Sequence, residues 1–127
     1  MAPFVLIVED QPSHAKLFSE ILRGNGRSSL VALKGREGVA VARRAAPALV
    51  VVDILLPDLD GRKVISELRG NPETEKTPIL AVSAVSDRAM ERECLAAGAD
   101  MFLSKPIGVQ QFSTVVAELL AAAAPQG

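Results

Sequence analysis

The chain has 127 residues, of which 49% are apolar, so it can bury a core without disulfides or a structural metal. Its net charge of -1 gives no electrostatic reason to expect a nucleic acid or an anionic membrane surface as a partner. No apolar run approaches the roughly 20 residues of a membrane-spanning helix. The single cysteine cannot form an internal disulfide, so we expect a cytoplasmic protein.

Apolar runs and turn residues divide the chain into alternating strands and helices. The first two of each are expected over these ranges: strand 4–8, helix from Pro12 to about Gly24, strand 28–33 and helix 37–46. Pro12 suits the first turn of its helix, where a missing N–H costs little, and Pro47 ends the second helix. The first helix carries apolar residues at helical spacing: Leu17, Phe18, Ile21 and Leu22.

The third strand carries the most informative residue, Asp53, directly after the unbroken apolar run 48–52. A continuous β-branched run is typical of a parallel strand that is buried on both faces. Pro57 and Gly61 then force a tight turn, which keeps the carboxylate at an open edge. Asp60 suits the N-cap of the third helix. That helix carries its apolar residues on one face: Val64, Ile65 and Leu68.

The last two strand–helix pairs follow the same pattern. They are expected as strand 79–82 leading to Ser83, a fourth helix capped by Ser86 or Asp87 and ending at Gly98, and strand 101–104. Lys105 and Pro106 follow that strand. The last helix is expected to bury a stripe of four residues: Val109, Phe112, Val116 and Leu119.

Five strand–helix units predict an α/β fold, a doubly wound parallel five-stranded sheet with helices on both faces. The flavodoxin-like order 2-1-3-4-5 fits, because it makes the first and third strands neighbours at the switch point where such folds bind ligands. Glu9, Asp10 and Asp53 would then converge in one crevice. We expect a single domain over 1–127, with a core of about 4–120 and a tail of 121–127.

Three carboxylates in one crevice repel one another, and a hard divalent cation resolves that conflict. Mg²⁺ prefers oxygen ligands and is commonly held by one or two carboxylates together with a phosphate. A carboxylate can itself be the nucleophile that takes up a phosphoryl group. Lys105 and the hydroxyl of Ser83 are suited to neutralising charge on the phosphoryl oxygens. The residues therefore predict a Mg²⁺-dependent phosphoryl site.

In their order and spacing, these residues resemble the receiver domain of two-component response regulators. The motifs that carry the resemblance are Glu9-Asp10, Asp53, Leu56-Pro57-x-x-Asp60-Gly61, Ser83-Ala84 and Lys105-Pro106. It extends from Phe4 to about Leu120. Within the family, the chain is similar to stand-alone, single-domain regulators of the cell-division type, on the motifs 5–10 and 105–107.

The resemblance implies a metal site and a phosphoryl acceptor. Asp53 would accept the phosphoryl group. Asp10 and Asp53 would bind Mg²⁺ directly, together with the backbone carbonyl of Leu55, and Glu9 would act mainly through water.

The resemblance also implies a switch. Lys105 would pair with Asp53 at rest and contact the phosphoryl group later, and its bond to Pro106 is usually cis in this family. Ser83 would hydrogen-bond a phosphoryl oxygen. Its movement would let Phe102, at the aromatic switch position, turn inward and change the surface of the fourth helix, fifth strand and fifth helix.

A receiver of this kind takes its phosphoryl group from a sensor histidine kinase or a histidine phosphotransfer protein and acts on a downstream protein target. We expect no enzyme activity beyond its own phosphorylation and dephosphorylation, and no nucleic acid or membrane partner. Segment 108–111 lacks charged residues, which favours a monomer. Leu55 and Val85 flank the route of an attacking water and are apolar, so we expect slow self-dephosphorylation.

Nearby polar residues have simpler interpretations. His14, four residues after Asp10, is interpreted as a solvated helix residue near the rim of the crevice. Asp58 and Asp60 are interpreted as turn and cap residues. Cys94 is interpreted as a small buried or half-buried apolar residue.

Four other functions compete with this one. Haloacid-dehalogenase-type phosphatases also use a strand-end aspartate with Mg²⁺, but they need an acid where this chain has Leu55. Flavodoxins bind flavin phosphate in a Ser/Thr-rich first loop, whereas loop 10–13 here is acidic. A receiver that works without phosphate, or one domain of a larger regulator or kinase, is compatible with the same residues.

Overall fold

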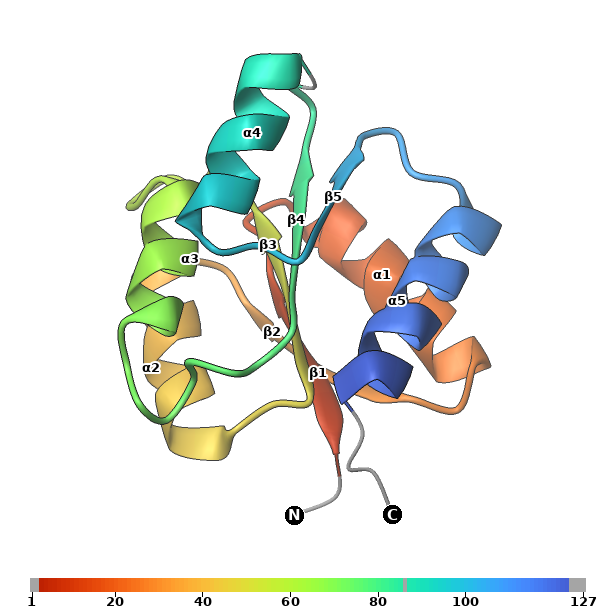
Figure 1. Cartoon of the computed structure of the whole chain (residues 1–127). Helices are drawn as coiled ribbons and strands as arrows, with labels where there is room; N and C mark the ends of the chain where they lie inside the picture. Colours follow the sequence, from red (N-terminus) through yellow and green to blue (C-terminus); the bar gives the residue numbers. More distant parts are fainter. Residues whose placement is uncertain (1–2, 86, 124–127) are drawn as a thin grey trace.

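The computed structural model describes residues 3–85 and 87–123 (Figure 1). The strands are β1 (Phe4–Val8), β2 (Ser28–Ala32), β3 (Leu49–Asp53), β4 (Ile79–Ser83) and β5 (Met101–Ser104). The helices are α1 (Pro12–Gly24), α2 (Gly35–Ala45), α3 (Gly61–Arg69), α4 (Arg88–Ala97) and α5 (Val109–Ala123). None of the helices in these described ranges is long and apolar enough to cross a membrane.

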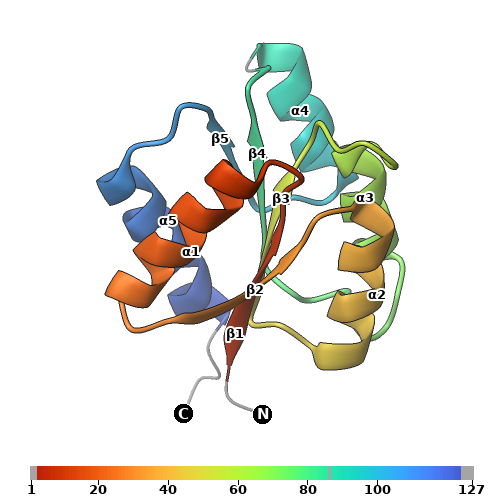
Figure 2. The same ribbon diagram turned by 180° about the vertical axis from the view of Figure 1, so that it is seen from behind.

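The five strands form one parallel sheet in the order β2-β1-β3-β4-β5. Helices α1 and α5 cover one face, and α2, α3 and α4 cover the other (Figures 1 and 2). This arrangement confirms the predicted doubly wound fold and its strand order. Because β1 and β3 are neighbours, the residues that follow them emerge side by side at one edge of the sheet.

The core consists of two apolar clusters, one on each face of the sheet. Every residue of β1, β3 and β4 is buried, as a continuous apolar run predicts for a central parallel strand. On the α1/α5 face, the rings of Phe18 and Phe112 stack with centroids 4.7 Å apart. The rigid sheet fixes the strand ends on which the functional residues sit.

Aspartates cap three of the helices. Asp60 accepts a hydrogen bond from the backbone N–H of Arg62 at 2.8 Å, as predicted. Asp87 caps α4 in the same way, whereas the alternative cap, Ser86, lies outside the described residues. The carboxylate of Asp58 reaches across to the first turn of α2, which therefore begins at Gly35 and not at 37.

Two apolar residues of the helical patterns are exposed, and one of them, Val109, was predicted to be buried. Leu17 is 45% exposed because it lies beside, and not on, the face of α1 that Ala15, Phe18 and Leu22 bury. Val109 is 58% exposed because it is the first residue of α5, ahead of the buried stripe. Val115 is buried in addition to the three other predicted residues of that stripe.

The burial of Val116 and the exposure of Val109 on α5 can be tested by changing each valine to alanine. Val116→Ala should lower the free energy of unfolding by about 1.5 kcal/mol, since it removes two buried carbon atoms from the core. Val109→Ala removes the same two carbon atoms from an exposed position and should change the free energy of unfolding by less than about 0.5 kcal/mol. Urea unfolding followed by circular dichroism measures both, and equal losses would contradict the assignment.

Candidate functional site

The predicted acidic residues meet at the carboxyl ends of β1 and β3. Glu9 and Asp10 follow β1, and Asp53 is the last residue of β3. One carboxylate oxygen from each of the three lies within 4.8 Å of the others. The side chains of Glu9 and Asp53 are almost fully buried. The sheet therefore concentrates three acidic groups at a single point.

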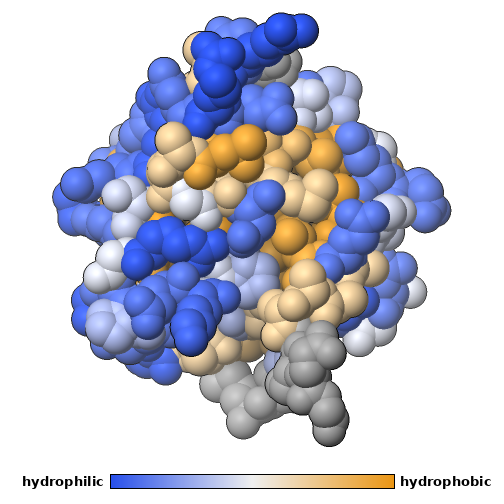
Figure 3. All heavy atoms as spheres, in the orientation of Figure 1, coloured by the Kyte–Doolittle hydropathy of each residue, from blue (hydrophilic) through white to orange (hydrophobic). Residues whose placement is uncertain are grey.

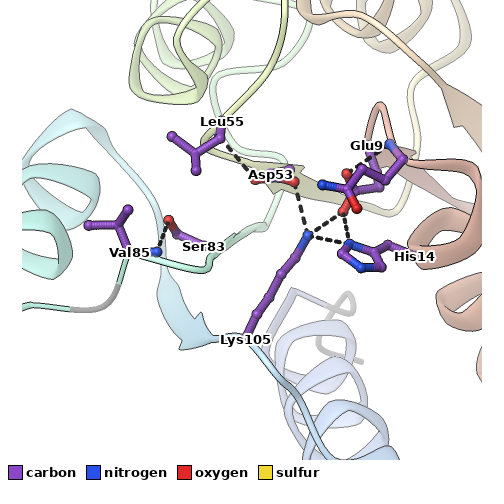
Figure 4. Close-up of polar contacts among 8 residues, drawn as sticks. Glu9, His14, Asp53, Leu55, Ser83, Val85 and Lys105 are labelled. Carbon is purple, nitrogen blue, oxygen red and sulfur yellow. Dashed lines mark hydrogen bonds and ion pairs between the residues drawn. The ribbon is translucent and has the colours of Figure 1, made fainter.

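Lys105 supplies the opposite charge from the loop after β5 (Figure 4). Its ammonium donates to Oε1 of Glu9 at 2.5 Å and to Oδ2 of Asp53 at 3.0 Å. It also lies 3.0 Å from Nδ1 of His14, which lies 3.5 Å from Oε1 of Glu9. The lysine side chain is only 12% exposed, so these ion pairs are poorly screened by water.

The electrostatics of the site show the cost of this crowding. Burial and the neighbouring Asp53 carboxylate raise the pKa of Glu9 to about 7, although the Lys105 ammonium opposes the shift. Burial alone would lower the pKa of Lys105, but its hydrogen bonds to Glu9 and Asp53 hold that pKa above its ordinary value. The cluster therefore carries more negative charge than one ammonium neutralises.

The donor set fits a hard divalent cation. Within the part of the chain that the structure describes, the buried oxygen Oδ1 of Asp10 has no hydrogen-bond partner. A buried carboxylate oxygen is costly to leave unpaired, and a cation would satisfy it. Three carboxylates with no thiolate favour Mg²⁺ over softer metals.

The loop between β3 and α3 holds the aspartate at the open edge. Oδ1 of Asp53 accepts a hydrogen bond from the N–H of Leu55 at 3.0 Å, and the N–H of Gly61 donates to the carbonyl of Ile54 at 2.9 Å. A Cβ atom at Gly61 would lie 2.6 Å from the carbonyl oxygen of Asp53. The turn therefore folds directly onto the backbone of Asp53.

Ser83 and Phe102 come from the two strands beyond β3 in the sheet, β4 and β5. The buried hydroxyl of Ser83 accepts a hydrogen bond from the N–H of Val85 at 3.1 Å, and its carbonyl accepts one from the N–H of Lys105 (Figure 4). Phe102 is half-buried and packs against the core on the α2–α4 face. The Lys105–Pro106 peptide bond is cis, as the resemblance implied.

The family follows from comparison with known proteins. The sequence model of the family described as the response regulator receiver domain matches residues 5–117. This range includes the three carboxylates and the lysine of the site. The chain belongs to this family. Receivers are signalling domains of two-component systems, which agrees with an acidic site and an ion-paired lysine at the strand ends.

The relatives include single-domain regulators. The polar-differentiation response regulators DivK of Brucella ovis and Brucella abortus are 31% identical over 120 residues, which is 94% of this chain and 98% of theirs. This result agrees with the predicted similarity to stand-alone regulators of the cell-division type.

Solved receivers have the same fold. The receiver domain of a histidine kinase from Syntrophus aciditrophicus is 30% identical, with a TM-score of 0.90, and the match covers 99% of this chain and 96% of that one. The receiver domain of sensor histidine kinase PA1611 from Pseudomonas aeruginosa is 26% identical, with a TM-score of 0.88, over 95% of this chain and 99% of that one. That structure has a magnesium ion coordinated in its active-site cleft.

Reasoning from the sequence missed one residue of this receiver site. His14 was interpreted as a solvated helix residue, and its side chain is indeed 40% exposed. Its Nδ1 nevertheless reaches the Lys105 ammonium. The available signal was its position in the first turn of α1, whose amino terminus adjoins the end of β1.

Proposed function

We propose that this chain is a phosphorylation-dependent signalling switch whose phosphoryl acceptor is Asp53. The observation that carries the proposal is the convergence of Glu9, Asp10, Asp53 and Lys105 at adjoining strand ends. The donor is a phosphohistidine on a sensor histidine kinase or a histidine phosphotransfer protein. The chain has no other enzyme activity in this proposal, and its output is contact with a protein target.

In the transfer step, a carboxylate oxygen of Asp53 forms a bond to phosphorus, and the bond from phosphorus to the donor's imidazole nitrogen breaks. The electron pair of that bond returns to the imidazole. Lys105, already 3.0 Å from Oδ2 of Asp53, neutralises charge on the phosphoryl oxygens, and the Ser83 hydroxyl donates to one of them. When bound by Asp10, Asp53 and the carbonyl of Leu55, with Glu9 acting through water, Mg²⁺ supplies charge neutralisation.

The output surface is formed by α4, β5 and α5. Hydrophobic side chains gather over the middle of this face (Figure 3). Leu95 of α4 and Val109 of α5 are exposed, and Phe102 of β5 is half-buried. An apolar area of this kind is suited to a protein partner, so we place the conformational response here.

The first test is the intact mass of the protein after incubation with acetyl phosphate, with and without Mg²⁺. The wild-type protein should gain the mass of one phosphoryl group only with Mg²⁺, and Asp53→Asn should gain none. Asp60→Asn is the matched control, because it makes the same chemical change at the far end of the loop that follows Asp53, and Asn caps a helix as well as Asp does.

Two outcomes would contradict the proposal. One is a phosphoryl gain by Asp53→Asn equal to that of the wild type, which would place the acceptor elsewhere. The other is no gain by the wild type from acetyl phosphate, from a phosphorylated histidine phosphotransfer protein or from a phosphorylated kinase.

We expect the phosphorylated protein to decay slowly. Leu55 and Val85 are both more than 40% exposed and apolar, so neither side chain can orient a water molecule for attack on the phosphoryl group (Figure 4). Leu55→Asn should shorten the lifetime by about tenfold, less than a positioned acid or base achieves, because an amide only orients the water. The decay of the phosphorylated mass measures this. A wild-type lifetime of seconds that Leu55→Asn leaves unchanged would contradict the expectation.

A further inference from the structure

The ammonium of Lys105 has three N–H groups and three neighbouring acceptors (Figure 4). Two are the carboxylates of Glu9 and Asp53, and the third is Nδ1 of His14. Within the described residues these are its three hydrogen-bond contacts. All donors of the group are therefore used, and His14 is the only uncharged acceptor among its partners.

The contact fixes the chemistry of the imidazole ring. An ammonium can donate hydrogen bonds but cannot accept them, so Nδ1 of His14 must present its lone pair to Lys105 at 3.0 Å. The ring is then neutral and carries its proton on Nε2. The alternative is a protonated ring that donates from Nδ1 to Oε1 of Glu9. Those atoms are 3.5 Å apart, and a protonated ring would put its positive charge against the Lys105 ammonium.

The two carboxylates cannot remain fixed partners of Lys105 in the proposed function, on which this inference rests. Asp53 would receive the phosphoryl group, and Glu9 would turn to the hydrated metal ion. The ammonium sits at the end of a long flexible stem, so its place depends on the acceptors around it. His14 takes part in neither exchange, and it is anchored on the first turn of α1.

We propose that His14 is a positioning residue, which holds the ammonium of Lys105 in line with Asp53 while the carboxylates exchange partners. It acts through Lys105 and does not touch the phosphoryl group. Its loss should slow phosphoryl transfer without weakening metal binding, because the carboxylates that bind the metal remain in place.

The first arm of the test compares wild type, His14→Ala and His14→Asn in the initial rate of phosphorylation by acetyl phosphate over a range of Mg²⁺ concentrations. Oδ1 of an asparagine lies as many bonds from Cα as Nδ1 of histidine and can accept the same hydrogen bond. We expect His14→Ala to lower the maximal rate by about tenfold, the value of one hydrogen bond to a charged group. His14→Asn should stay within about twofold of wild type, and the half-saturating Mg²⁺ concentration should be unchanged in both.

The second arm needs no phosphorylation. His14 is the chain's single histidine, so its ring nitrogens give unambiguous ¹⁵N NMR signals. At pH 8 the wild-type ring should be protonated on Nε2, and Lys105→Met should release it to a mixture of the two neutral tautomers. Thermal unfolding of both His14 variants, which change a partly exposed side chain, should match that of wild type.

The outcomes separate the inference from the proposed function. Equal maximal rates for wild type and His14→Ala, or a wild-type ring protonated on Nδ1, would overturn the role of His14 while Asp53 remains the acceptor. A loss of rate in His14→Asn as large as in His14→Ala would also overturn it. A wild-type protein that accepts no phosphoryl group contradicts the proposed function instead, and the tautomer alone then decides whether His14 accepts from Lys105.

Discussion

Gly61→Ala is expected to lower the free energy of unfolding by about 3 kcal/mol, the upper end of the cost of overpacking. A Cβ atom at this position would lie 2.5 Å from the Cα of Ile54 and 2.6 Å from the carbonyl oxygen of Asp53. Both neighbours are backbone atoms of a buried strand end, so they cannot rotate away as a side chain would. The turn must open, and the carboxylate of Asp53 moves with it. Urea unfolding followed by circular dichroism measures the loss.

Gly24→Ala is the matched control for this substitution. A Cβ atom there has no neighbour within 4 Å among the described residues, and the position is helical. Alanine should therefore leave stability unchanged or raise it by up to about 1 kcal/mol. Equal behaviour of the two variants would show that the turn after β3 does not need a glycine.

The fold was predictable from the sequence because its strongest signals do not depend on packing detail. The apolar runs that became β1, β3 and β4 are buried on both faces, which only a central parallel strand explains. Once these strands alternate with helices, topology alone brings Glu9 and Asp53 together. The core of the site therefore follows from strand order.

Contacts between elements were less predictable. Asp58 accepts a hydrogen bond from the N–H of Gly35, 23 residues earlier in the chain. No local sequence pattern predicts a contact over that separation. His14 meets Lys105 across 91 residues, because the angle of α1 against the sheet decides where its first turn points. The exposure of Val109 has the same origin, since apolar spacing does not tell where a helix first touches the sheet.

The switch roles expected of Ser83 and Phe102 come from the family resemblance. They require a second conformation of the protein. In this structure the Ser83 hydroxyl accepts a hydrogen bond from the Val85 N–H, and Phe102 packs on the core. A phosphoryl group shifts the equilibrium between two conformations only through contacts that it makes in one conformation and not in the other. Both roles therefore stay predictions that phosphorylated protein would test.

Lys105→Met is expected to lower the free energy of unfolding at pH 8, without metal, by about 3–5 kcal/mol, the cost of leaving one half of a buried ion pair uncompensated. Glu9 and Asp53 lose the ammonium that each contacts within 3.0 Å. Lys63→Met is the matched control, because Lys63 is exposed on α3 and should change stability by less than about 0.5 kcal/mol. Urea unfolding at pH 5 and pH 8, with EDTA or with Mg²⁺, measures the stability of the wild type and of the two variants.

The pH dependence distinguishes an electrostatic cost from lost packing. Glu9 has its pKa raised from 4.5 to about 7 in the folded protein, so its contribution to stability is full below about pH 4.5 and is lost as the pH rises through 7. Metal-free wild type should therefore be more stable at pH 5 than at pH 8. Because Lys105 lowers the pKa of Glu9, its removal should raise that pKa further and make the decline steeper. The cost of Lys105→Met should shrink at pH 5, where Glu9 takes up a proton, and also with Mg²⁺, which replaces the missing positive charge. A cost that is the same at both pH values and unaffected by Mg²⁺ would instead assign the contribution of Lys105 to the packing of its stem.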